Sequence, residues 1–364
     1  MALVMIARNE ARCIARCLRS IAHVVDDIVV LDTGSDDDTV AIARQCGARV
    51  HHFTWIDDFA AARNAALDLS NADWNLVLDA DEWLAGDAGA LLPSALGGAP
   101  FIGVIPVANS FDLHGKVEVA VSWISRLLPR GVRYEGRIHE QPVSILPRRN
   151  VQLPIQHDGY LQLALAAKDG RNEALLLRAL AESPDDAYLH YQLGKNYEIY
   201  GQFDQAVSCY SQALARSGAQ SPFRHDLVVR TIFSMKKANL HAQAIQLAES
   251  EMPNWQHSPD FFFALGDLML DWATLNSAIA FEELLPIAES SWLTCLQLGD
   301  QPALAGSVTG RGSHLAAHNL AVLYDGMGNV DKAAFYRELA QHRQLPINTQ
   351  NSLFSDQFVI GCKP

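Results

Sequence analysis

Short apolar runs alternate with amphipathic segments over the first 85 residues. Strands are predicted at 3–6, 28–31, 49–53 and 74–78, and helices at 10–21, 38–46 and 58–69. In the first helix, Ile14, Leu18 and Ile21 fall on one face. Parallel neighbouring strands need crossover connections, so single helices between strands predict a doubly wound α/β sheet.

Polar residues follow three of these predicted strands. Ligands of doubly wound sheets bind at the carboxyl ends of the strands, so a ligand site is expected where these residues lie. The polar groups are Arg8-Asn9-Glu10, Asp32-Thr33-Gly34-Ser35 and Asp79-Ala80-Asp81-Glu82.

The pattern changes twice further along the chain. Short strands with Gly and Pro between them are predicted at 101–107, 117–124 and 143–145, which suits a mixed extension of the sheet. Beyond about residue 160 the periodicity is helical. We therefore predict an α/β domain over 1–165, helical repeats over 166–345 and a tail over 346–364.

The helical part carries an internal repeat of the tetratricopeptide kind. Small residues of the repeat let paired helices approach closely, and the aromatics fill the space between them. Tyr197 is expected to pack, and Tyr191 to lie on the exposed concave face. The first unit comprises Leu193-Gly194, Tyr197, Gly201, Phe203, Ala206, Tyr210 and Ala213; the last comprises Leu320-Ala321, Tyr324, Gly328, Ala333 and Ala340; Leu265-Gly266 with Ala278, and Ala244, resemble degenerate units.

Composition narrows the possible partners. The chain has 28 Lys and Arg against 41 Asp and Glu, a net charge of −13, which disfavours nucleic acid and anionic lipid. Its six cysteines include no Cys-x-x-Cys pair, and Cys13 and Cys17, four apart, are expected to pack beneath a helix rather than to bind metal. No signal peptide or long apolar run is seen, so a cytoplasmic protein without a membrane span is predicted.

Asp79-Ala80-Asp81 is the strongest candidate for chemistry, because it follows directly on the apolar strand ending at Leu78. A sugar leaving a nucleoside diphosphate generates negative charge, which a divalent cation held by carboxylates neutralises. Asp79 can reach ribose hydroxyls and Asp81 can bind Mn²⁺ or Mg²⁺. A solvated acidic turn is the alternative interpretation.

Four segments resemble successive motifs of family 2 glycosyltransferases with the GT-A fold: 5–10, 30–37, 58–65 and 78–82. Two later segments, Gly136-Arg137-Ile138-His139-Glu140 and His157-Asp158-Gly159-Tyr160, precede the repeats. This combination is similar to a narrower branch that includes the sublancin-type S-glycosyltransferases, which attach a sugar to a cysteine of a small bacteriocin peptide.

The resemblance implies a role for each matching residue. The backbone at Ala7 would face the nucleobase, Asp32 would accept from the uracil imide, and Arg63 would contact the base carbonyl or a phosphate. Asn9 and Glu10 belong to the same donor site. The alternatives are a helix-capping turn for Asp32 and an ion pair with Asp57 or Asp58 for Arg63.

The metal and the base complete the expected site. His157 is the candidate third protein contact beside the metal, with a core histidine bonded to backbone as the alternative. An inverting displacement needs a carboxylate to take the acceptor proton. Glu140 is the candidate base, with Glu82 and Asp112 behind it. Three arginines are candidates for the pyrophosphate side or for plain surface positions: Arg126, Arg130 and Arg133.

Together these features predict an inverting, metal-dependent glycosyltransferase that moves a hexose from a UDP-sugar. Stacked helix pairs suit extended chains, so a peptide or protein acceptor (Cys, Ser or Thr) is favoured. The repeats could equally make a homodimer. A saccharide acceptor of surface-polysaccharide or lipopolysaccharide assembly is the alternative. A non-catalytic repeat scaffold is the alternative of another class, which intact Asp32, Arg63, Asp79 and Asp81 disfavour.

Overall fold

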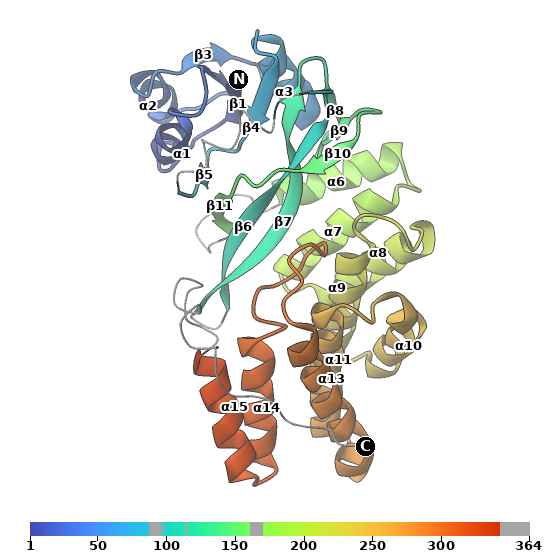
Figure 1. Ribbon diagram of the computed structural model, residues 1–364. Coiled ribbons are helices and arrows are strands. Elements are labelled where there is room, and N and C mark those ends of the chain that lie inside the picture. Colours follow the sequence, from blue (N-terminus) through green and yellow to red (C-terminus); the bar gives the residue numbers. More distant parts are fainter. Residues whose placement is uncertain (87–95, 97, 114–115, 161–169, 343–364) are drawn as a thin grey trace. The chain divides into compact units, whose positions relative to one another are not determined.

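The computed structural model describes residues 1–86, 96, 98–113, 116–160 and 170–342 (Figure 1). The chain forms two compact units: Met1–Ala238 with Pro302–Ser307, and 239–301 with the residues from 308 on. The first repeat helices therefore belong to the same unit as the α/β domain. The domain boundary expected near residue 165 stays a prediction, and the tail over 346–364 lies outside the described residues.

A mixed sheet forms the α/β part of the first unit. Its strands run in the order β3-β2-β1-β4-β7-β6-β11-β5, with β10 beside β6. The four strands from β3 to β4 are parallel, whereas β7 is antiparallel to both β4 and β6. The strands are β1 (Ala2–Ala7), β2 (Asp27–Asp32), β3 (Arg49–His52), β4 (Trp74–Val77), β5 (Glu82–Leu84), β6 (Ile102–Leu113), β7 (Lys116–Pro129), β10 (Arg148–Asn150) and β11 (Ile155–Tyr160).

Side chains of the parallel strands alternate between two apolar cores, because successive residues of a strand point to opposite faces. On β1, Leu3 and Met5 pack with helix α1 (Ile14–Ile21), while Ala2 and Val4 pack with helix α3 (Phe59–Asp68). Helix α2 (Thr39–Gln45) adds Ala43 to the first core. The sheet is thus covered on both faces, as the run of buried strands predicts.

One predicted strand lies elsewhere. Val143 to Ile145 was expected to be extended, but β9 spans Gln141–Val143 and pairs with β8 (Arg133–Glu135) in a small separate sheet. The pairing ends at Val143, which lies opposite Arg133, and Ile145 beyond it is fully exposed. The side-chain pattern of three residues does not reveal which strand they pair with or where that pairing stops.

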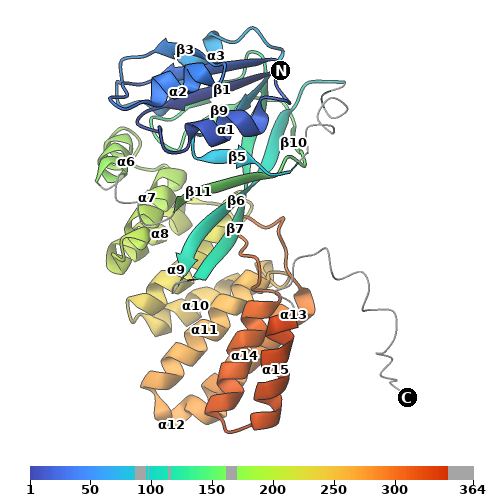
Figure 2. The ribbon, with the colours of Figure 1, turned by 90° about the vertical axis from the view of Figure 1, so that its left-hand side faces the viewer.

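The helices beyond residue 170 are arranged largely in pairs, and α14 and α15 lie side by side (Figures 1 and 2). Helices α6 to α9 belong to the first unit and α10 to α15 to the second. The helices are α6 (Arg171–Glu182), α7 (Ala187–Ile199), α8 (Phe203–Arg216), α9 (Arg224–Lys237), α10 (His241–Glu251), α11 (Pro259–Leu275), the short α12 (Ser277–Ile279), α13 (Leu285–Leu298), α14 (His314–Gly326) and α15 (Val330–His342).

In two of these helix pairs, a glycine of one helix packs against an aromatic ring of the other. A Cβ on Gly194 of α7 would lie 2.4 Å from Tyr210 of α8, and one on Gly266 of α11 would lie 2.6 Å from Trp292 of α13. The close approach predicted for Gly194 is confirmed. Ala278, which with Leu265-Gly266 resembles a degenerate unit, is exposed in α12, because α12 and a π-helical turn (Ala280–Leu284) precede α13.

The expected exposed position of Tyr191 is wrong. Tyr191 is 5% exposed, and its hydroxyl donates to the carboxylate of Asp226 on α9. Arg230 Nε donates to the same carboxylate at 2.7 Å. The next helix, α9, covers this face of α7, so Tyr191 is a core residue. Tyr197 is buried as predicted, and its hydroxyl donates to Glu173.

The glycine pairs can be tested by stability. Gly194→Ala should lower the free energy of unfolding by about 1–3 kcal/mol, since Tyr210 leaves no room for the added methyl group. Gly326→Ala is the matched control: this helical glycine has open space around its Cβ position, so the change should be neutral or slightly stabilising. Urea denaturation followed by circular dichroism measures both, and equal effects at the two positions would contradict the packing argument.

Candidate functional site

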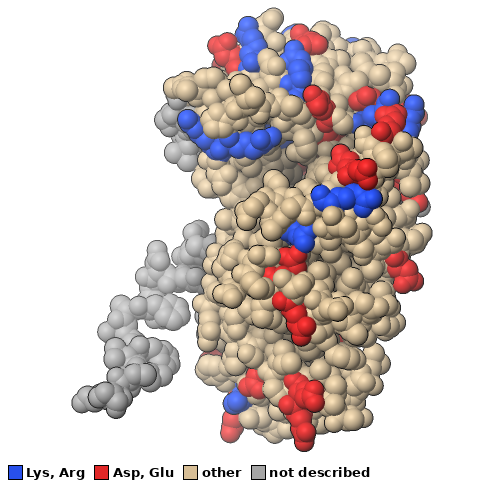
Figure 3. Space-filling view, turned by 90° about the vertical axis from the view of Figure 1, so that its right-hand side faces the viewer, with Lys and Arg blue, Asp and Glu red and all other residues tan. Residues whose placement is uncertain are grey.

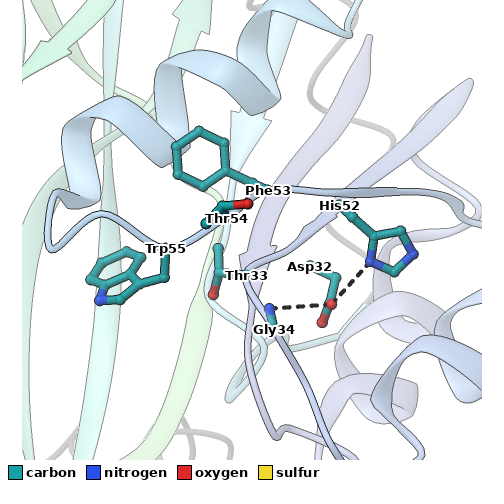
Figure 4. Close-up of a pocket in the computed structure, with 7 residues that line it drawn as sticks. All are labelled: Asp32, Thr33, Gly34, His52, Phe53, Thr54 and Trp55. Atoms are coloured by element: carbon teal, nitrogen blue, oxygen red, sulfur yellow. Dashed lines mark hydrogen bonds and ion pairs between the residues drawn. The ribbon is translucent and has the colours of Figure 1, made fainter.

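A pocket of about 370 Å³ lies where β2 and β3 end (Figure 4). Its volume lies in the range usual for small-molecule sites. Of the expected donor-site residues, Asp32 lines it, at the carboxyl end of β2. The complete lining is Asp32, Thr33, Gly34, His52, Phe53, Thr54 and Trp55.

Asp32 is held as a carboxylate within this pocket. Burial alone raises the pKa of the carboxyl, but hydrogen bonds from Ser35, His52 and Gly34 outweigh it and keep the pKa below its usual value. The backbone N–H groups of Ser35 and Gly34 donate at 3.2 and 3.3 Å, and His52 Nδ1 lies 3.2 Å from Oδ2. The carboxylate accepts from the turn that follows β2 and faces the pocket, but it does not cap a helix as the alternative interpretation held, because the N-cap of α2 is Asp38.

His52 and Trp55 are pocket residues that the sequence analysis missed. His52 ends β3, so the strand-end rule that selected Asp32 applies to it equally. Trp55 is fixed from two sides: its Nε1 donates to Asp57 at 2.9 Å, and its ring packs edge-on against Phe59 with centroids 4.8 Å apart. An aromatic ring held in this way offers a flat apolar wall for a planar ligand.

A second constellation centres on Asp79, which follows β4. Arg63 Nη2 on α3 donates to Asp79 Oδ1 at 2.7 Å, and Arg126 Nη2 on β7 donates to Oδ2 at 2.7 Å. Arg126 also donates to Glu82 at 2.7 Å, and Arg63 Nε donates to Glu140. Arg63 therefore does not pair with Asp57 or Asp58. It joins two of the expected site residues.

Asp79 is the accessible member of this charged cluster. Its side chain is 36% exposed, against 7% for Arg63 and 9% for Arg126 and Glu140. Burial would raise the pKa of Asp79, but the two guanidinium groups hold it well below its ordinary value. Asp79 is consequently an anion at all ordinary pH values, with an exposed edge that ligand hydroxyls can reach.

The other residues of the charged cluster differ in whether they have polar atoms without a hydrogen-bond partner. Burial and the neighbouring Asp79 raise the pKa of Glu82, although Arg126 acts in the opposite direction. At 3% exposure, with one oxygen on Arg126 and the other accepting from the Asp79 backbone N–H, Glu82 is fully engaged. Arg63 Nη1 and Arg126 Nε, both buried, have no hydrogen-bond partner in the described structure.

The three arginine candidates occupy different environments. Arg130 and Arg133 form exposed pairs with Asp73 and Asp68, so they are surface residues. Arg126, by contrast, belongs to the charged cluster. Asp112 lies in β6, but its side chain lies outside what the structure describes.

Asp81 and His157 come together, although they lie far apart in the sequence. His157 Nε2 on β11 is 3.3 Å from Asp81 Oδ2. The other ring nitrogen, Nδ1, is 2.8 Å from Asn109 Oδ1 on β6, which fixes the orientation of the ring. Burial lowers the pKa of His157, but Asp81 outweighs it and the pKa is raised. The contact to Asn109 excludes a histidine bonded only to backbone.

This pair suits a divalent cation. A carboxylate oxygen and an imidazole nitrogen face each other, and a side-chain oxygen orients the ring from behind, as is usual for metal-binding histidines. Among the described residues, no group of three or more His, Cys, Asp or Glu side chains could hold a metal ion. Asp81 and His157 are the two candidate donors that the structure brings together here.

Ala7, Asn9 and Glu10 stand at the end of β1. The Ala7 carbonyl accepts from Thr33 N at 2.9 Å. Asn9 has φ +58° and its Oδ1 accepts from Asp36 N, while the Glu10 backbone N–H donates to Thr39 Oγ1 at 2.7 Å. These residues tie the β1 loop to the β2 loop. None of the three lines the pocket, so their contact with a donor stays a prediction.

Comparisons with known proteins agree with this geometry. Residues 2–126 match the model of glycosyl transferase family 2. This segment, about a third of the chain, is thus similar to the family 2 glycosyl transferase domain. The matched segment carries Asp32, Arg63, Asp79 and Asp81, and the α/β domain followed by tetratricopeptide-like helix pairs confirms the fold class predicted from the sequence.

Two curated relatives extend beyond the family 2 domain. A TPR repeat-containing protein of Synechococcus elongatus is 35% identical over 62% of this chain and 59% of its own length. The SPbeta prophage-derived glycosyltransferase SunS of Bacillus subtilis is 24% identical over 58% of this chain and 52% of its own length. This chain thus spans between half and three fifths of these relatives, and both agree with the resemblance to a sublancin-type branch with repeats.

A solved structure with a partial likeness is glucosyl-3-phosphoglycerate synthase of Mycobacterium tuberculosis, in complex with Mn²⁺, uridine diphosphate and glucosyl-3-phosphoglycerate. The identity is 25% over 30% of this chain and 43% of that chain, with a TM-score of 0.25.

The cysteines beside the family 2 site are structural. Cys13 is 2% exposed and Cys17 is fully buried, and both are free thiols. Burial raises the pKa of both thiols well above the ordinary range, which keeps them protonated and unreactive. The predicted packing role is confirmed.

The surface shows mixed charge. On the face drawn in Figure 3, Lys and Arg side chains occur in small groups beside Asp and Glu. The expectation that nucleic acid is not a partner stays a prediction. Within the described part of the chain, no helix has the length and apolar character needed to cross a membrane.

His139, next to the candidate base, gives a test by pH. Burial, and then the charge of Lys195, lower its pKa to about 3. The unfolded chain therefore binds a proton that the folded chain does not between about pH 6.5 and 3, so stability falls as pH drops through this window. His139→Gln should reduce this loss. Melting temperatures of both proteins at pH 7 and pH 5 measure it, and an identical decrease in both would contradict the shift.

Proposed function

We propose that this protein is an inverting, metal-dependent glycosyltransferase that moves a hexose from a UDP-sugar to a peptide or protein side chain. The observation that carries the proposal is the cluster in which Arg63 joins Asp79, at a strand end, to Glu140. In this cluster the guanidinium group of Arg63 pairs with both the candidate ribose-binding carboxylate, Asp79, and the candidate base, Glu140. The match of residues 2–126 to the model of glycosyl transferase family 2 supports sugar transfer.

The pocket at Asp32 is the proposed place for the uracil ring. A carboxylate kept ionised by backbone N–H groups is a strong acceptor for the imide N–H. Trp55 and Phe53 line the same pocket and offer apolar surface to the flat base. Asp79, with its exposed edge, then accepts from the ribose hydroxyls.

Asp81 and His157 would hold a divalent cation beside the donor diphosphate. When bound, the cation would neutralise the charge that develops on the departing nucleotide. Asn109 keeps the imidazole in the orientation in which Nε2 faces Asp81. Arg126 Nη2 bridges the neighbouring carboxylates of Asp79 and Glu82 by donating to both.

Glu140 is the proposed base that takes the proton from the acceptor. Glu82 is less suited, because both of its oxygens are already hydrogen-bonded and its side chain is almost fully buried. Arg63 holds Glu140 through Nε. An acceptor nucleophile approaching Glu140 loses its proton to the carboxylate as the new glycosidic bond forms on the face opposite the nucleotide.

The proposed acceptor class rests on the repeats. Helix pairs of this kind bind extended chains, which favours a peptide or protein with a Cys, Ser or Thr nucleophile. A saccharide acceptor is the second candidate. A purely scaffolding role is disfavoured, because it gives no reason for two buried arginines around an accessible carboxylate.

The nucleobase assignment can be tested by binding. Asp32→Ala should weaken UDP binding by about 1–3 kcal/mol, because the imide N–H loses its buried acceptor. Asp27→Ala, at the opposite end of β2, is the control and should leave the affinity unchanged, because Asp27 pairs with Arg49 outside the pocket. Isothermal titration calorimetry measures both, and equal affinities would remove Asp32 from the site.

The cation site can be tested with and without turnover. In the wild-type protein, Mn²⁺ should strengthen UDP binding, and EDTA should reverse the gain. Asp81→Ala should lose this gain and abolish sugar transfer while the circular dichroism spectrum is retained. Asp68→Ala, an exposed carboxylate paired with Arg133, is the control. If Asp81→Ala keeps the Mn²⁺ effect, the cation lies elsewhere.

A further inference from the structure

The segment 137–141, which carries Glu140, is attached to the family 2 domain at two points. The carbonyl of Arg137 accepts from the backbone N–H of Phe59, the first residue of α3, at 2.8 Å. Glu140 itself is paired with Arg63, one turn further along the same helix. One side of the segment is therefore fixed to α3.

The other side of the segment is attached to the repeat helices. Arg137 Nε donates to Glu182 on α6 at 3.2 Å. Ile138 is 4% exposed and belongs to the apolar core of the first repeats rather than to either core of the sheet. Gln141 Nε2 donates to the hydroxyl of Tyr188 on α7 at 3.1 Å. The same core contains Leu175, Leu176, Ala179, Leu189, Tyr191, Leu193 and Tyr197, among others.

The backbone of the segment needs these attachments. His139 has φ +51°, in the left-handed region that residues other than glycine seldom adopt. Such a conformation persists only where the surrounding contacts impose it. The two residues that flank His139–Glu140 are the ones in contact with the repeats: Ile138 before and Gln141 after. Gln141 Nε2 also approaches the His139 carbonyl at 3.4 Å.

We propose that the first repeat is part of the catalytic apparatus, with Tyr188 acting as a positioning residue for Glu140. The Tyr188 hydroxyl holds Gln141, and Gln141 holds the strained turn that presents Glu140 to Arg63 and the acceptor. This inference rests on the proposed role of Glu140 as the base. It assigns to helix α7 a function in turnover, separate from any contact with the acceptor chain.

Tyr188→Phe removes the hydroxyl alone and is the decisive variant. UDP-glucose hydrolysis, in which water replaces the acceptor, is the probe reaction. The kcat should fall about 2- to 10-fold, the range for one lost hydrogen bond, with KM and the affinity for UDP unchanged. Tyr197→Phe is the matched control on the same helix: it removes a hydroxyl that donates to Glu173 at 3.0 Å, away from the segment, and should keep the wild-type kcat.

Gln141→Leu should be at least as slow as Tyr188→Phe, because it also removes the contact to the His139 carbonyl, and the double variant should be no slower than Gln141→Leu, because that change already removes the contact to Tyr188. Hydrogen exchange gives a readout without turnover: amides of 137–141 should exchange faster in Tyr188→Phe and at the wild-type rate in Tyr197→Phe. Unchanged kcat and exchange in Tyr188→Phe, or equal losses in both tyrosine variants, would overturn the proposal.

Glu140→Gln separates this inference from the function on which it rests. If Glu140→Gln is inactive while Tyr188→Phe turns over at the wild-type rate, the base assignment holds and the positioning role is overturned. If Glu140→Gln hydrolyses UDP-glucose at the wild-type rate, the base assignment itself fails, whatever the exchange data show about the contact to α7.

Discussion

The pairing of two buried guanidinium groups with Asp79 is the interaction on which the site depends. Arg63 and Arg126 come from α3 and from β7, and neither could be buried without carboxylates to accept its hydrogen bonds. Asp79, Glu82 and Glu140 supply them. Removing one partner from such a cluster leaves an uncompensated buried charge, which is far more costly than replacing the whole cluster by apolar residues.

This cluster also explains why the site has both a rigid and an accessible part. The arginines and Glu82 are enclosed, whereas more than a third of the Asp79 side chain is open. Hydrogen bonds from two sides fix the orientation of the Asp79 carboxylate. The two guanidinium groups also lower its pKa, so the carboxylate keeps its charge far below physiological pH. Asp81, two residues on, pairs with His157.

Much of this arrangement could be predicted from the sequence. Apolar strands followed at once by Asp32 and Asp79 mark the ligand edge of a parallel sheet, and the resemblance to family 2 motifs pointed to Arg63 and His157. What local patterns did not reveal was which distant partners these residues meet. Arg126 looks like its neighbours Arg130 and Arg133 in the sequence, and only the antiparallel pairing of β7 with β4 turns it inward.

Errors in the repeats have a similar cause. Tyr191 occupies a position that periodicity leaves open to solvent, and it is buried because α9 covers it. Ala278 has the correct spacing from Gly266 for a standard unit. A short helix and a π-helical turn come before the partner helix, however, and it is Trp292 of that helix that packs against Gly266. In both cases the geometry of the next element, and not the residue itself, determines the outcome.

The strand order of the sheet has a consequence for the order of folding. During synthesis, β1 to β4 emerge early and can form their parallel ladder, but β5 finds its partner only when β11 is complete. His157 arrives with β11, and Tyr188, which contacts Gln141, arrives later still, with α7. A nascent chain that ends before α7 therefore lacks contacts of the candidate site that depend on distant partners, and long-range pairings of this kind form slowly.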